Sequence, residues 1–105
     1  MENLTPEQKQ QALFMQLVIM FQQAAWAHLG KVPNPMTEKI ERDLEQARMS
    51  IDMLDMIKAR TQGNLSDDEN KLLDHALREL KLNYIDELDK DKKEKADLPT
   101  AENKP

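Results

Sequence analysis

The chain has 105 residues, a net charge of -5 and 33% charged side chains, with only two glycines and no cysteine. This length predicts a single domain, and the lack of cysteine excludes disulfides and thiolate metal ligands. The acidic balance argues against nucleic acid as a partner, because phosphate binding depends on clustered Lys and Arg. The excess of acids falls on residues 63–88, so no segment is basic enough to bind an anionic surface.

The first predicted helix covers about residues 6–29. Thr5 suits the N-cap, Pro6 the first helical position and Gln8 the returning half of a capping box. Gly30 and the prolines of KVPNP end the helix, because glycine enters the left-handed conformation easily and proline cannot donate a backbone hydrogen bond. The opening segment MENLTPEQKQ carries acids where a secretory leader would be positive, so we expect no signal peptide and a cytoplasmic location.

Two further helices are predicted at about residues 37–62 and 67–88. Gly63 and Asn64 form a C-cap signal, and Ser66 with Glu69 forms a second capping box. The link GNL is so short that these helices must fold back on each other, and the longer link GKVPNPM also forces a reversal. The sequence therefore predicts an all-α, up-down-up antiparallel bundle of three long helices.

The C-terminal segment 89–105, DKDKKEKADLPTAENKP, holds ten charged residues in seventeen and almost no apolar ones. Such a segment cannot bury enough surface to offset the entropy of ordering. We expect a disordered charged tail after a helical domain that spans residues 1–88.

Each predicted helix carries an apolar stripe at spacings of three and four residues, as a core face requires. The stripe of the first helix comprises Phe14, Leu17, Phe21, Ala24 and His28. The second comprises Ile40, Leu44, Ala47, Ile51 and Leu54, and the third Leu73, Leu77, Leu80 and Tyr84. Three stripes of this length are enough to close one bundle.

Two apolar stripes are left over. In the first helix, Met15, Ile19, Gln22 and Trp26 repeat the same spacing about 150° from the first stripe. In the second helix, Met49, Met53 and Met56 lie nearly opposite the core stripe. We interpret these seven residues as an interface, which a single three-helix bundle leaves in water.

Three explanations of this surplus surface compete: a membrane span, a helix lying in the membrane interface, and self-association. An interfacial helix would need Lys and Arg along its polar side, where the first helix offers only glutamines. A membrane span is disfavoured, because residues 12–29 contain three glutamines and a histidine and lack basic flanks. Self-association fits better, with a dimer favoured, although a different protein partner stays open. Two alternatives remain: Met15, Ile19 and Trp26 are core residues of a monomer, or the surplus surface encloses a small apolar ligand or lipid in a cavity between helices.

Catalytic, cofactor and metal sites are not predicted. His28 and His75 are the only imidazoles, and neither has the glutamate spacing of a di-iron or zinc helix motif. The acids at 67–69 fit a helix start rather than a calcium loop, and Ser50 and Ser66 have no histidine placed to activate them. The sequence thus predicts a non-enzymatic, homo-oligomeric protein–protein interaction module.

From Leu13 to about Leu88 the chain resembles a family of short bacterial proteins known only as a domain of unknown function. The resemblance rests on LFMQLVIMFQQAAWAHLG followed by NP, on ARMSIDMLDMIKARTQGNLSDDE and on LLDHALRELKLNYI. It implies a soluble bacterial helical protein and brings no known substrate, cofactor or functional residue.

Overall fold

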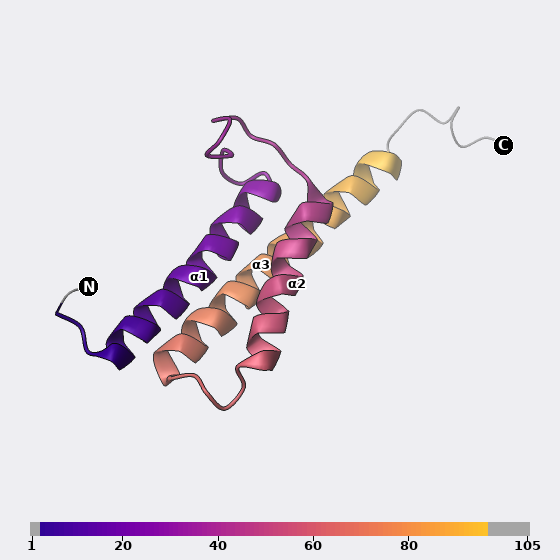
Figure 1. Ribbon diagram of the computed structural model, residues 1–105. Coiled ribbons are helices and arrows are strands. Elements are labelled where there is room, and N and C mark those ends of the chain that lie inside the picture. The colour runs from indigo at the N-terminus through magenta and orange to yellow at the C-terminus, as the bar shows by residue number, and fades with distance from the viewer. Residues whose placement is uncertain (1–2, 97–105) are drawn as a thin grey trace.

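The computed structural model describes residues 3–96 and contains three helices there, shown in Figure 1: α1 (Pro6–His28), α2 (Leu44–Arg60) and α3 (Asp67–Ala96). The predicted all-α class is therefore confirmed. No helix in the described part of the chain combines the length and the apolar character needed to cross a membrane.

Contacts between the helix ends give the directions of the three helices. The Asp43 amide donates to the His28 carbonyl at 2.8 Å, so α2 begins beside the end of α1. Lys58 pairs with Asp74 at 2.6 Å and Lys81 with Asp55 at 3.0 Å, so positions fall along α2 as they rise along α3. Figure 1 shows the same reversal of the chain at each connection.

The start of α1 follows the local signals in the sequence. The Gln8 amide donates to the Thr5 hydroxyl at 3.1 Å, and the Thr5 amide donates to the Gln8 side chain at 3.0 Å. This reciprocal pair is the predicted capping box, and it satisfies two backbone donors that the first turn leaves free. Gly30, with φ of +81°, follows the last residues of the helix as predicted.

The second helix begins seven residues later than predicted, at Leu44 instead of about Thr37. Asp43 is its N-cap and accepts a hydrogen bond from the Gln46 amide at 3.2 Å. Residues 37–42 belong instead to a loop in which Glu38 has φ of +61°, which an α-helix cannot contain. Ile40, predicted for the core, is consequently exposed.

The third helix is longer than predicted and continues to Ala96, so the boundary of the expected tail at residue 89 was wrong. Extending an existing helix costs little, and the eight added residues are stabilised by charge. Lys90 pairs with Glu87 at 2.9 Å, and Lys93 and Lys95 lie at the negative end of the helix dipole. The rest of the expected tail, residues 97–105, lies outside the described residues.

Apart from Ile40, the core confirms the stripes predicted for α2 and α3. Ala47, Ile51 and Leu54 of α2 are buried against three buried leucines of α3, while Leu44 and Tyr84 pack at the edge. The buried leucines are Leu73, Leu77 and Leu80.

The core face of α1 differs from the prediction. Val18 and Ala25 are fully buried, whereas Leu17 is exposed and Ala24 only half-buried. At about 100° per residue, Val18 and Ala25 fall midway between the two stripes predicted for this helix. The two stripes are therefore the flanks of one broad face. Because the centre of this face holds small side chains, α1 can pack against both other helices.

Candidate functional site

The predicted interface residues separate into two groups. Met15, Ile19, Gln22 and Trp26 of α1 are half-buried, and Trp26 packs against the core. The expectation that this stripe faces away from the core was therefore wrong for Trp26. Met49, Met53 and Met56 of α2 are exposed, as predicted.

An exposed stripe on α1 was missed by the sequence analysis. Leu13, Leu17 and Met20 are all exposed and repeat at spacings of four and three residues. Between Lys9 and His28 the helix has no charged side chain, so this stripe is bordered by glutamines and alanines rather than by ions. The signal that could have found it is this absence of charge, which an ordinary solvent-facing helix surface does not show.

The fifteen residues between α1 and α2 form a compact loop whose two ends meet at the His28–Asp43 hydrogen bond. Loops of this length with adjacent ends are Ω-loops and are frequently functional. Asn34 organises the interior of the loop. Its carbonyl accepts from the Glu38 amide at 2.6 Å, its amide donates to the Lys39 carbonyl at 2.8 Å, and its side-chain oxygen accepts from the Met36 amide at 2.8 Å.

The loop and the second half of α1 enclose an open groove of about 740 Å³. The helix contributes Met20, Ala24 and Trp26 to its lining, and the loop contributes Val32 and Met36. Met36 is 90% exposed, the highest exposure among the large apolar side chains described. The carrier alternative placed a cavity between helices, but this groove lies between one helix and the loop that follows it.

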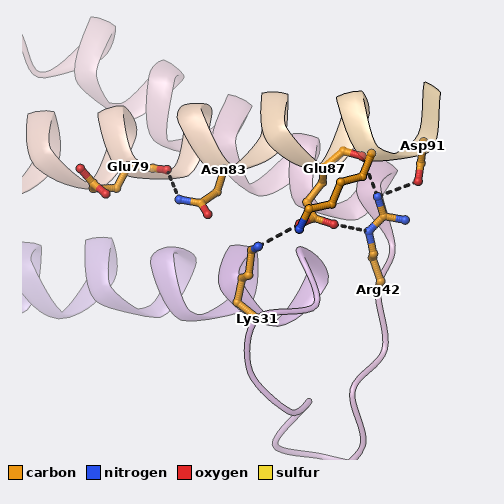
Figure 2. A network of polar contacts seen from close by, with 7 residues as sticks. Lys31, Arg42, Glu79, Asn83, Glu87 and Asp91 are labelled. Atoms are coloured by element: carbon orange, nitrogen blue, oxygen red, sulfur yellow. Dashed lines mark hydrogen bonds and ion pairs between the residues drawn. The ribbon is translucent and has the colours of Figure 1, made fainter. Parts of the chain in front are cut away.

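A buried carboxylate fixes both ends of the loop to α3, as Figure 2 shows. Glu87 is only 6% exposed. One of its carboxylate oxygens accepts from Lys31 and Lys90, each at 2.9 Å, and the other accepts from Arg42 at 2.8 Å. Arg42 also donates to the Glu87 carbonyl and to Asp91, each at 2.9 Å. We call these five residues the Glu87 cluster.

Hydrogen bonds from Lys31 and Lys90 lower the pKa of Glu87 to about 2, against the desolvation that burial imposes. A carboxyl group with so low a pKa stays ionised at neutral pH and is poorly matched to general acid or base catalysis there. The geometry of the Glu87 cluster is therefore suited to holding the loop against α3.

The remaining candidate residues have ordinary surroundings. His75 is exposed, while His28 lines the groove. Arg48 and Asp52 form an exposed pair at 3.9 Å, and Glu69 accepts from the Ser66 amide at 2.8 Å in the predicted capping box. Among residues 3–96, no three His, Asp or Glu side chains are grouped closely enough to hold a metal ion.

The fold and these surfaces define a small all-α bundle with exposed apolar side chains and a preformed loop. The chain belongs to the family described as "Domain of unknown function (DUF1844)", whose model matches residues 11–86. The resemblance to an uncharacterised domain family is thus confirmed. No match was found among curated proteins or among solved structures.

Proposed function

We propose that this protein is a non-enzymatic interaction module that pairs with a second copy of itself through an apolar surface on α1 and α2. The surface comprises the two exposed stripes, and we call it the α1/α2 face. Its residues are Leu13, Leu17, Met20, Met49, Met53 and Met56. The observation that carries the proposal is their joint exposure on two helices that pack directly against each other.

The antiparallel pairing of α1 and α2 determines where the two stripes lie relative to each other along the helix axes. Because His28 lies beside Asp43, a residue eleven positions before His28 lies level with one eleven positions after Asp43. Leu17 is therefore level with Leu54, next to Met53. Both stripes have the same spacing of four and three residues, so they occupy the same level along the two helices over about two turns.

The energy of covering this face is sufficient for a dimer. The exposed fractions of the six side chains together equal about three fully exposed large apolar residues per copy. Burying such residues contributes about 1.5 to 3 kcal/mol each, or about 9 to 18 kcal/mol for two copies. Association costs about 4 to 15 kcal/mol, so the gain can exceed the cost.

Like-charge repulsion does not oppose this pairing on the α1 side, because α1 has no charge from Gln10 to Ala27. Methionine, which supplies four of the six side chains, adapts its shape to an opposing surface. The lack of cysteine in the chain supports a reducing compartment such as the cytoplasm.

Sedimentation velocity at micromolar concentration tests the proposal. We expect the wild-type protein to sediment as a dimer and the double variant Leu13→Glu with Met49→Glu to sediment as a monomer. Both residues are about half exposed, so the variant should keep its helical circular dichroism. Burying a carboxylate without a partner at the contact costs several kcal/mol, which separates the copies.

The matched control is Leu82→Glu with Ile85→Glu, two equally exposed apolar residues on the outer side of α3. This variant should remain a dimer. A monomeric wild type, or a control that dissociates as completely as the α1/α2 variant, would overturn the proposal.

A further inference from the structure

The loop that forms one wall of the groove is held in a single conformation by many independent constraints. Asn34 makes hydrogen bonds to five other loop residues, and the Glu87 cluster ties both Lys31 and Arg42 to α3. Pro33 and Pro35 restrict the backbone of the same wall. The groove is therefore preformed, which reduces the entropy that a ligand would lose on binding.

Backbone strain also occurs in this loop. Glu38 has φ of +61°, and it is the one residue other than glycine with positive φ in the described part of the chain. A strained residue persists only where the surrounding contacts hold it, and such residues cluster at binding sites. The strain lies four residues from Asn34, which lines the groove.

The lining determines what kind of molecule fits. None of the described lining residues is Asp, Glu, Lys or Arg, and Met20, Trp26, Val32 and Met36 supply an apolar surface. The volume of about 740 Å³ falls in the range of small-molecule sites, about 300 to 1,000 Å³. A protein partner would need about 20 to 30 residues on each side, more than this groove offers.

Polar groups are few and lie among the apolar ones. Gln23, His28 and Asn34 line the groove together with Trp26. Sites for small molecules have this composition, with a mainly apolar wall and a few polar groups that orient the ligand. We propose that the groove is a binding site for an uncharged, mainly apolar small molecule.

The test uses the neutral fluorescent hydrophobe N-phenyl-1-naphthylamine as the probe. Trp26 lines the groove and is the only tryptophan in the chain, so its emission responds to a probe bound there, and the variants below locate the probe because energy transfer acts beyond the groove. We expect saturable binding of one probe per chain, with quenching of Trp26 by energy transfer to the probe. Binding without saturation, or without a change in Trp26 emission, would overturn the proposal.

Two variants alter opposite walls of the groove. Val32→Ser with Met36→Ser removes apolar contacts from the loop, and Ala24→Phe fills the space from the helix. Each should weaken probe binding by about tenfold or more, since two lost apolar contacts or a blocked volume cost at least that factor. Retention of full affinity in both variants would place the probe elsewhere.

The control Leu82→Ser with Ile85→Ser removes equally exposed apolar side chains from α3 and should leave the affinity unchanged. A further arm separates this site from the proposed dimer contact, because Met20 belongs to both surfaces. The variant Leu13→Glu with Met49→Glu should bind the probe as the wild type does. Loss of binding in this variant would mean that the probe occupies the contact between copies, and the ligand-site proposal would fail.

Discussion

The chain reverses direction twice, through fifteen residues between α1 and α2 and through only six between α2 and α3. The short connection is determined by neighbours in sequence: Gly63 in the left-handed conformation and the Ser66–Glu69 capping box. The long connection is held by Arg42 and Lys31, whose partner Glu87 lies 45 and 56 positions away. A connection built from local signals needs little support from the fold, whereas the long loop depends on it.

Among the tests of this contrast, removal of the Glu87 side chain should have the largest effect on stability. We expect Glu87→Ala to lower the free energy of unfolding by about 3 kcal/mol, because Lys31 and Arg42 lose their buried partner. Their side chains are about one-third exposed, so water compensates in part and the effect stays at the lower end of the range for broken buried pairs. Urea denaturation should show a lower midpoint with an unchanged slope.

The control for this variant is Asp91→Asn, which removes the exposed partner of Arg42. We expect a loss below about 1 kcal/mol, as for most exposed pairs. Equal losses in the two variants would show that the burial of Glu87 contributes nothing to holding the loop.

The second expected effect is a loss of stability at low pH. The pKa of Glu87 is lowered from 4.5 to about 2 in the folded chain, so its contribution is fully present above about pH 4.5 and is lost as the pH falls toward 2. A shift of this size corresponds to about 3 kcal/mol at most, and we expect about 2 because the cations face water. Urea titrations between pH 5 and pH 2 should show this loss in the wild type and a flatter profile in Glu87→Gln.

The smallest effect compares the two glycines, one in each connection. Gly30 and Gly63 both have positive φ, of +81° and +85°, so alanine is strained at either position. A Cβ at Gly30 would also lie 3.3 Å from Cβ of Arg42, while a Cβ at Gly63 would meet nothing within 4 Å. We expect Gly63→Ala to cost about 1 kcal/mol and Gly30→Ala about 2 kcal/mol in thermal unfolding.

A double-mutant cycle adds a sharper criterion to this comparison. Alanine at position 30 acts partly by displacing Arg42. The free energy of unfolding lost on Gly30→Ala should therefore be smaller in the Glu87→Ala background, where Arg42 no longer pairs with Glu87. The cost of Gly63→Ala should stay the same in both backgrounds. Simple additivity for both glycines would contradict the coupling of the long loop to α3.

The same contrast explains how much of the molecule could be predicted from the sequence. The helix starts at Pro6 and Asp67 and the core stripes of α2 and α3 follow from caps and periodicity within a few residues. The start of α2 was misplaced because the apolar spacing of Ile40 continues the stripe of α2. The hydrogen bonds that hold Asn34 and Arg42 in the loop cannot be predicted from the spacing of apolar residues.

The candidate site was predicted only in part. The exposed methionines of α2 were found, since they lie opposite a clear core stripe. The face of α1 was misjudged because its centre consists of Val18 and Ala25, which are smaller than the phenylalanines and tryptophan on its flanks. The groove and the Glu87 cluster both require the folded loop, and no spacing rule brings Lys31, Arg42 and Glu87 together.

The broad face of α1 also has a consequence for synthesis on the ribosome. This helix is translated before α2 and α3, against which it packs in the folded bundle. At a synthesis rate of about 5 to 20 residues per second, several seconds pass between the synthesis of α1 and that of Leu80 in α3. Residues from Gln10 to Ala27 carry no charged side chain that would oppose association with other nascent chains. The surface that closes the folded bundle is thus open to contact with other nascent chains until α3 has been made.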